Sequence, residues 1–98
     1  MMTRHEIESK LSAHKEELRD MGVDSLFLFG SYLKGEADGQ SDLDLLVEFR
    51  DPVGLFQFFK VQHRLEEILR VDKVDLVERG ALHPALRDDV LREAVGVA

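Results

Sequence analysis

Two aspartates placed two residues apart are the strongest candidates for chemistry in this chain. Asp42 and Asp44 open an apolar run, and ten residues separate Asp42 from Ser31, which follows Gly30 at the end of an earlier apolar run. Side chains alternate between the two faces of a strand, so both carboxylates would share one face. If the two runs are antiparallel neighbours in a sheet, Ser31 and the carboxylate pair converge at one edge.

A third carboxylate, Asp75, stands in the middle of another short apolar segment, Lys73 to Val77. Converging carboxylates repel one another unless a cation lies between them, and Mg²⁺ prefers oxygen ligands together with water and substrate phosphates. Gly30 allows close approach of the backbone to a ligand, and Ser31 offers a hydroxyl and amide groups at the start of a predicted short helix. Together these residues predict a site for a phosphate and a metal.

The pattern around these residues predicts alternating helices and strands. We expect the first helix to begin at a Thr3–Glu6 capping box and to stop at Gly22, and the later elements to cover strands 24–29, 42–49 and 73–77, helix 53–70 and a last helix that begins at Pro84. The carboxylate face of strand 42–49 is too polar to lie beneath a helix. We therefore expect an α/β chain of the α+β-like two-layer type, a mixed sheet with helices mainly on one face.

Helix 53–70 contains three of the six phenylalanines of the chain. Its packed arc is expected to hold Leu55, Phe58, Phe59, Leu65 and Leu69. Phe56 lies about 100° around the helix from Leu55, outside that arc. An aromatic in this position can anchor a protein interface, or it can cover the helix end or a nearby loop. Phe56 is therefore a possible interface residue.

Composition restricts the class of partner. Residues 1–98 are expected to form a single domain. The net charge of −7, from 13 basic and 20 acidic side chains, argues against direct DNA binding, whereas a cation can mediate between carboxylates and a nucleotide. There is no cysteine, no signal-peptide core, and no apolar run near the roughly 20 residues that span a bilayer. We expect a cytoplasmic protein without membrane contact.

The combined motif resembles that of a known enzyme superfamily. The sequence Gly30-Ser31, ten residues, then Asp42-Leu43-Asp44 is similar to the signature of the DNA polymerase β nucleotidyltransferases. Gly35-Glu36-Ala37, the string Ser41 to Val47, and Val74-Asp75-Leu76-Val77 resemble its minimal nucleotidyltransferase branch, over nearly the whole chain. This resemblance implies the nucleotidyltransferase fold, ATP as substrate and a two-metal Mg²⁺ site.

The resemblance also implies a role for each carboxylate of the motif. Asp42 and Asp44 would bind both metal ions, and Asp75 would bind one of them and assist the nucleophile. Two metal ions about 3.5–4 Å apart can serve the attacking and the leaving oxygen of such a transfer. All three aspartates are thus predicted to be catalytic and metal-binding.

For the nucleotide phosphates, the resemblance implies binding by Gly30, Ser31 and Lys34. The chain departs from the branch at this point, because Leu33-Lys34 stands where Ala-Arg is typical after the Gly-Ser-aromatic triplet. Lysine keeps the positive charge but lacks the planar fork with which arginine binds a phosphate through two hydrogen bonds.

Members of the branch are commonly encoded beside a HEPN-domain ribonuclease and act as its antitoxin, and some adenylylate a tyrosine of that toxin. The resemblance therefore implies transfer of AMP from ATP to a tyrosine hydroxyl of a HEPN-type toxin with which the chain forms a complex. Two alternatives stay open: a non-catalytic antitoxin that neutralises the toxin by binding, and a nucleotidyltransferase acting on a small molecule such as an aminoglycoside. The acceptor, the base specificity and the oligomeric state do not follow from the sequence.

Overall fold

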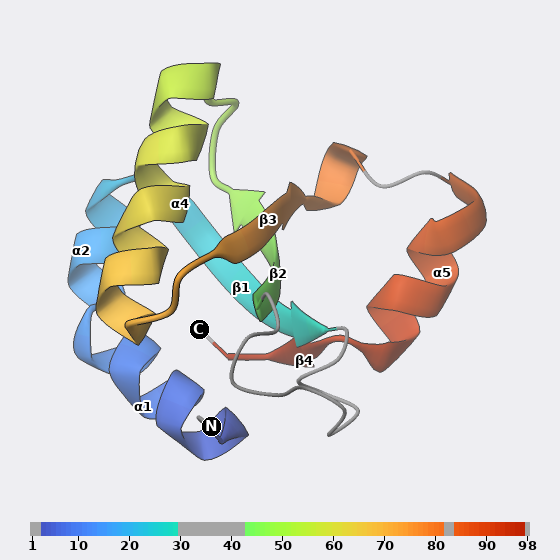
Figure 1. The fold of residues 1–98 in the computed structure, drawn as a ribbon. Helices are drawn as coiled ribbons and strands as arrows, with labels where there is room; N and C mark the ends of the chain where they lie inside the picture. Colours follow the sequence, from blue (N-terminus) through green and yellow to red (C-terminus); the bar gives the residue numbers. More distant parts are fainter. Residues whose placement is uncertain (1–2, 30–42, 82–83, 98) are drawn as a thin grey trace.

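A mixed sheet forms the centre of the computed structural model, which describes residues 3–29, 43–81 and 84–97 (Figure 1). Within these residues the sheet has four strands in the order β3-β2-β1-β4. The elements, in chain order, are α1 (Arg4–Ala13), α2 (Lys15–Asp20), β1 (Val23–Phe29), β2 (Leu43–Phe49), α4 (Leu55–Leu69), β3 (Val74–Glu78), the 3₁₀ helix η1 (Arg79–Ala81), α5 (Pro84–Glu93) and β4 (Val95–Gly96).

The strand directions confirm a mixed sheet. β1 is antiparallel to both β2 and β4, whereas β2 and β3 run parallel. A parallel pair needs a long crossover connection, and α4 supplies it between β2 and β3. Helices α1, α2 and α4 lie on one side of the sheet and α5 on the other (Figure 1). This agrees with the expectation that helices lie mainly on one face, which was based on the carboxylates that alternate with apolar residues at the start of β2 and make the other face polar.

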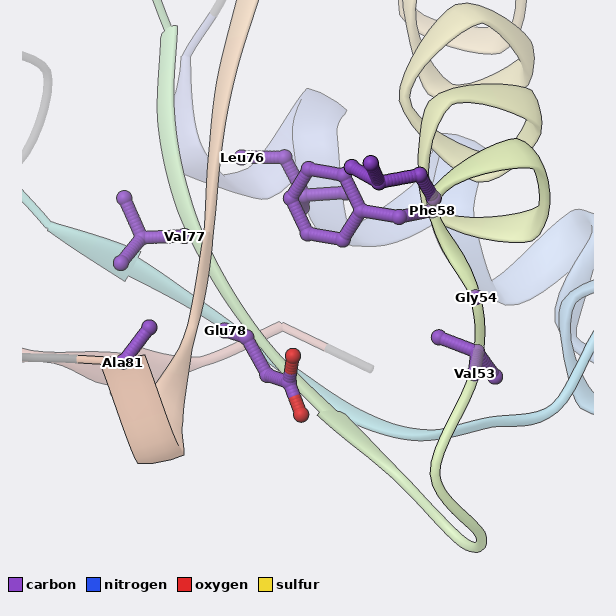
Figure 2. Close-up of a pocket in the computed structure, with 8 residues that line it drawn as sticks. Val53, Gly54, Phe58, Leu76, Val77, Glu78 and Ala81 are labelled. Carbon is purple, nitrogen blue, oxygen red and sulfur yellow. The ribbon is translucent and has the colours of Figure 1, made fainter.

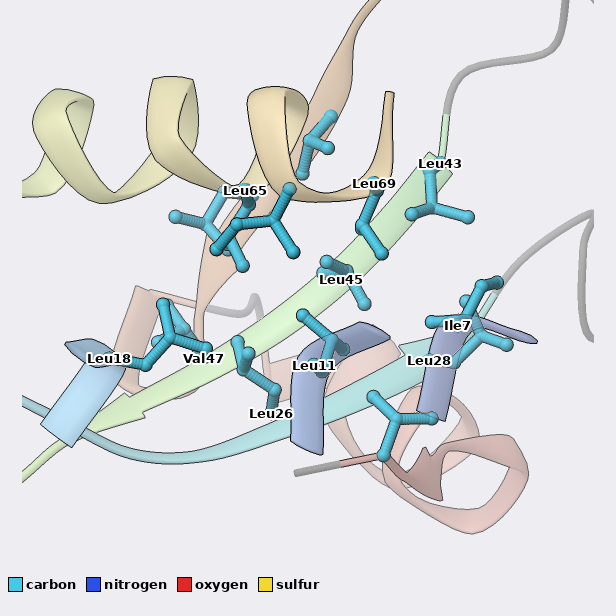
Figure 3. Packing of buried hydrophobic residues seen from close by; sticks show 14 of the residues in the cluster. Ile7, Leu11, Leu18, Leu26, Leu28, Leu43, Leu45, Val47, Leu65 and Leu69 are labelled. Atoms are coloured by element: carbon cyan, nitrogen blue, oxygen red, sulfur yellow. The ribbon is translucent and has the colours of Figure 1, made fainter. Parts of the chain in front are cut away.

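The core lies between the sheet and the helices α1, α2 and α4. Figure 3 shows leucines of β1 and β2 meeting side chains of these helices in a single layer. Leu26, Leu28, Leu43, Leu45 and Leu65 have no exposed surface. Leu46 is equally buried but points to the opposite face, so this face of the sheet is not wholly open.

The N-terminal helix begins as expected but is interrupted. The Thr3 hydroxyl accepts a hydrogen bond from the Glu6 amide at 3.2 Å, which confirms the cap. At His14 the backbone leaves helical geometry, with φ −114° and ψ 19°, and the ring Nδ1 lies 3.0 Å from the Lys10 carbonyl oxygen. The expected single helix is therefore two helices. Gly22 ends the second with φ +96°, a conformation that favours glycine.

The predicted apolar arc of α4 is wrong at its N-terminal end. Leu65 and Leu69 are buried as expected, but Leu55 is 71% and Phe59 is 48% exposed. Burial instead includes Val61 and Ile68. The reason is geometric, since the first turn of α4 extends past the end of the helix layer, as Figure 1 shows, and has no strand or helix above it.

Two ion-pair networks tie the elements together. Arg64 of α4 donates to the two carboxylate oxygens of Glu17 in α2, at 2.5 and 3.0 Å. On the other face, Glu48 of β2 accepts from Ser25 of β1 at 3.1 Å and from Arg79 of η1. Both carboxyl groups have a lowered pKa, chiefly because of the hydrogen bond from the arginine. The networks fix α2 against α4 and η1 against the sheet.

Candidate active site

The start of β2 brings two of the predicted site residues together. Asp44 pairs with Phe29 across the antiparallel β1–β2 ladder and with Asp75 across the parallel β2–β3 ladder. Neighbouring strands lie about 4.8 Å apart, so the two aspartates stand side by side. We call this pair, at the starts of β2 and β3, the carboxylate end of the sheet.

Both carboxylates lie on the face of the sheet opposite the helix layer. Their neighbours Leu43, Leu45, Val74 and Leu76 are buried, four of the apolar side chains that face α4. Alternation then directs Asp44 and Asp75 to the other side. Asp44 is half-buried and Asp75 is exposed. An acceptor on another molecule can therefore reach Asp75 more easily than Asp44.

The position of Asp75 depends on two polar residues of α4 that the sequence did not single out. Val74, immediately before Asp75, donates its backbone N–H to the Glu66 carboxylate at 2.9 Å. Its carbonyl accepts a hydrogen bond from the Gln62 side chain at 2.8 Å. Gln62 and Glu66 are four residues apart and so lie on the same side of the helix. That spacing is the signal that could have identified them.

The remaining predicted site residues lie outside the described part of the chain. These are Asp42, which precedes β2, and Gly30, Ser31 and Lys34, which follow β1 along the sequence. The described strands do confirm the topology on which their convergence was predicted. Phe29, the last residue of β1, is the ladder partner of Asp44 near the first residue of β2.

The donor set at the carboxylate end fits a hard divalent cation. Asp44 and Asp75 supply carboxylate oxygens from adjacent strands, and like charges directly opposite each other in a sheet are destabilising without a counter-charge. Oxygen donors with open coordination positions suit Mg²⁺. Among the described residues no group of three metal-ligating side chains occurs, and the third expected ligand, Asp42, lies outside those residues.

A separate pocket of about 320 Å³ lies at the opposite end of β3. We call it the β3–α4 groove, and it is lined by Val53, Gly54, Leu55, Phe58, Leu76, Val77, Glu78 and Ala81. It lies between the start of α4 and the end of β3 (Figure 2). The groove is mostly apolar and contains neither aspartate of the carboxylate end.

The fold is that of a nucleotidyltransferase, and comparison with known proteins agrees. The model of the family described as "Nucleotidyltransferase domain" matches residues 11–97. The chain therefore belongs to the nucleotidyltransferase domain family. In the part of the chain that the structure describes, no helix has the length and apolar content needed to cross a membrane.

One relative is similar over its whole length. The protein adenylyltransferase MntA of Thermococcus cleftensis is 45% identical over 98 residues, which cover 99% of this chain and 98% of the relative. A solved structure described as a minimal nucleotidyltransferase has a TM-score of 0.80 at 36% identity and covers 96% of this chain and 95% of its own.

Two toxin–antitoxin structures share the fold at lower identity. One, solved with AMP-PNP, has a TM-score of 0.73 at 27% identity, with 93% of this chain and 72% of the other covered. The second contains a tri-AMPylated Shewanella oneidensis HEPN toxin in complex with an MNT antitoxin. Its TM-score is 0.66 at 22% identity, with 94% and 71% covered, and this likeness shows the fold alone.

Proposed function

We propose that this nucleotidyltransferase moves AMP from ATP to a tyrosine hydroxyl of a HEPN-type toxin and thereby acts as its antitoxin. The observation that carries the proposal is the pairing of Asp44 with Asp75 on the face of the sheet opposite the helix layer. The 45% identity to a protein adenylyltransferase along the full chain supports AMP as the transferred group. The likeness, at 27% identity, to a toxin–antitoxin structure solved with AMP-PNP supports a toxin as acceptor.

In this proposal Asp42, Asp44 and Asp75 hold Mg²⁺ and Gly30, Ser31 and Lys34 contact the phosphates of ATP. Bound there, Mg²⁺ would neutralise the triphosphate and polarise its α-phosphate. In the proposed reaction Asp75, which is exposed, orients the acceptor hydroxyl and takes its proton. The acceptor oxygen then forms a bond to the α-phosphorus, the bond to the bridging oxygen breaks, and pyrophosphate leaves.

The acceptor is proposed to arrive on another protein. Among the described residues, the carboxylate end lies on a sheet face and the β3–α4 groove lies elsewhere, so neither supplies a pocket for a small acceptor beside Asp75. A docked protein can hold its hydroxyl in line with the α-phosphate without such a pocket.

Phe56 is a further candidate contact for this partner. Its side chain is 96% exposed, which rules out the interpretation that it covers the helix end or a loop within the described residues. A large, fully solvated aromatic is typical of interface anchors. We keep Phe56 as a proposed partner contact.

The experiment combines the chain with the protein encoded by the neighbouring gene, where a HEPN-type toxin is expected, together with ATP and Mg²⁺, and measures the intact mass of that protein. We expect AMP to be added, and EDTA or the double variant Asp42→Asn with Asp44→Asn to prevent the addition. Asp72→Asn, which removes an exposed carboxylate outside the predicted site, is the matched control and should leave transfer intact. A partner that stays unmodified but is inhibited equally well by the double variant would contradict the transfer reaction and establish neutralisation by binding.

A further inference from the structure

The backbone of β3 presents unused hydrogen-bonding groups on the outer side of the sheet. β3 is an edge strand in the described sheet, with β2 as its neighbour on one side. The Leu43 amide donates to the Lys73 carbonyl at 3.3 Å, so Lys73 points its backbone groups toward β2. Backbone groups alternate along a strand, so those of Val74, Leu76 and Glu78 point away from β2.

On the outer side of β3, the backbone hydrogen-bonding groups have partners at Val74 but not at Leu76. At Val74 both backbone groups are bonded by side chains of α4, the Glu66 carboxylate and the Gln62 amide. Within the described residues, the outward N–H and C=O of Leu76 have no hydrogen-bond partner. An edge strand with unpaired N–H and C=O groups is a template on which another strand can add.

An apolar groove lies beside this open segment. In Figure 2, Phe58 and Leu76 lie next to each other, with Val53 and Gly54 across from Glu78. Leu55, at the same place, keeps 71% of its surface exposed. An added strand would pair its backbone with Leu76 while every second side chain points into the β3–α4 groove. The open edge of β3 and the adjoining β3–α4 groove together resemble sites at which an extended peptide binds as an added strand, with its side chains in a neighbouring pocket.

The charge of the groove adds a second requirement. Glu78 is the ionisable side chain of its lining, and it forms no ion pair within the part of the chain that the structure describes. The protein as a whole carries a net charge of −7. A basic side chain in the bound segment would complement Glu78. Since Leu76 and Glu78 are two residues apart, an apolar residue and a basic residue at a spacing of two would meet them both.

A second copy of this chain does not fit the same edge. Antiparallel pairing of two β3 strands about Leu76 would place Glu78 of each copy opposite Val74 of the other. The backbone groups of Val74 are already bonded to Glu66 and Gln62. The outward N–H and C=O of Leu76 are the groups left for pairing, and a separate segment that bonds to them can continue past the end of β3.

We infer that the β3–α4 groove binds an extended segment of a partner protein by strand addition to β3, with a branched apolar residue in the groove and a lysine or arginine two positions away at Glu78. This site is distinct from the carboxylate end and does not rest on the transfer reaction.

The probe is a library of random dodecapeptides displayed on phage and selected against the full chain. We expect enriched sequences that combine a branched apolar residue with a basic residue at a spacing of two. Synthetic versions of an enriched peptide, N-methylated one residue at a time, should lose binding at alternate positions, because only every second peptide N–H would face β3. The absence of any enriched peptide, or uniform tolerance of N-methylation, would overturn strand addition.

Two variants at one position test the location. A side chain at Gly54 meets no atom within 4 Å of its Cβ, and the backbone angles of φ −80° and ψ 174° suit any residue, so the fold tolerates substitution there. Gly54→Trp should fill the groove and weaken peptide binding at least tenfold, whereas Gly54→Ser should leave binding unchanged. Glu78→Gln should weaken binding several-fold and remove its salt dependence. Equal binding by all three variants, or a peptide-independent dimer, would contradict the assignment.

Discussion

At its start, β3 carries a carboxylate beside that of β2 on one face of the sheet, whereas at its end it borders an apolar groove on the other face. The two regions adjoin along the same strand, because Leu76, the residue after Asp75, already lines the groove. The carboxylate end concentrates like charge, which is unfavourable for folding and useful for binding a cation. The β3–α4 groove leaves apolar surface exposed, which is useful for binding a chain. Each region thus has a locally unfavourable feature that the ligand proposed for it would relieve.

The largest effect is expected at the carboxylate end. Asp44→Asn removes a charge from a pair of adjacent carboxylates, and we expect transfer to fall at least about a hundredfold, the scale that loss of one electrostatic group costs at a reacting centre. Stability should stay the same or rise, because repulsion from Asp75 is relieved. AMP transfer and thermal unfolding measure the two effects. Near-normal transfer would remove Asp44 from the proposed site.

Two leucines of α4, one in the core and one at the groove, allow a direct comparison of their contributions to stability. Leu65→Ala removes a side chain without exposed surface and should lower the free energy of unfolding by about 2–5 kcal/mol. Leu55→Ala removes one that is 71% exposed and should change it by less than about 0.5 kcal/mol. Denaturant unfolding of both variants measures the difference. Similar losses would mean that the start of α4 is packed in solution.

Phe56 tests whether the start of α4 contacts the partner. Phe56→Ala should weaken binding of the HEPN-type protein by about 2 kcal/mol, a value typical of a buried aromatic anchor. The melting temperature of the free protein should not change, since the side chain is 96% exposed. Titration calorimetry with the partner and thermal unfolding distinguish the two effects. Unchanged affinity would exclude Phe56 from the interface.

The smallest effect concerns acid stability. The hydrogen bond from Arg79 is the main cause that holds the pKa of Glu48 below its ordinary value, and Ser25 adds to it. The charged form is thus favoured in the folded state, so this contribution is present above about pH 4.5 and is lost as the pH falls through the lowered pKa. Glu48→Gln should flatten the loss of stability below that pH and cost less than about 1 kcal/mol at neutral pH. Unfolding followed from pH 7 to pH 3 in both proteins provides the measurement, and parallel curves would contradict this role of Glu48.

Most helices and strands could be predicted, because they depend on the alternation of apolar and polar residues along strands and on residues that end or begin helices. The apolar positions of β2 and β3 decide which face each side chain takes, so the placement of Asp44 and Asp75 on one face follows from the same pattern that buries Leu43 and Leu45. That the two aspartates pair directly is a finding of the structure. Gly22 and Pro84 marked an end and a start correctly, and the structure places Pro84 at the first position of α5.

The features that escaped prediction depend on neighbours distant in sequence. β4 has two residues, too few for any periodic pattern, and it exists because β1 offers it a partner. The exposure of Leu55 and Phe59 depends on how far the sheet extends beneath the helix. Helical periodicity predicts which side chains share a face, but it does not predict that extent. Gln62 and Glu66 act on β3 through single hydrogen bonds, and their types are ordinary for an exposed helix face. For Asp42, Gly30, Ser31 and Lys34, the proposed roles rest on the motif.

The small strand β4 also has a consequence for handling the protein. It pairs with β1 at Phe27 and Leu28, and the adjoining Val97 amide donates to the Leu26 carbonyl at 2.9 Å while its side chain is 96% buried, with 4% exposed. Without residues 95–97, the outer side of a strand rich in leucine and phenylalanine would lie open, and such strands promote aggregation. Shortening the chain before Val95 should therefore reduce its solubility and storage life while Asp44 and Asp75 keep their places on the sheet.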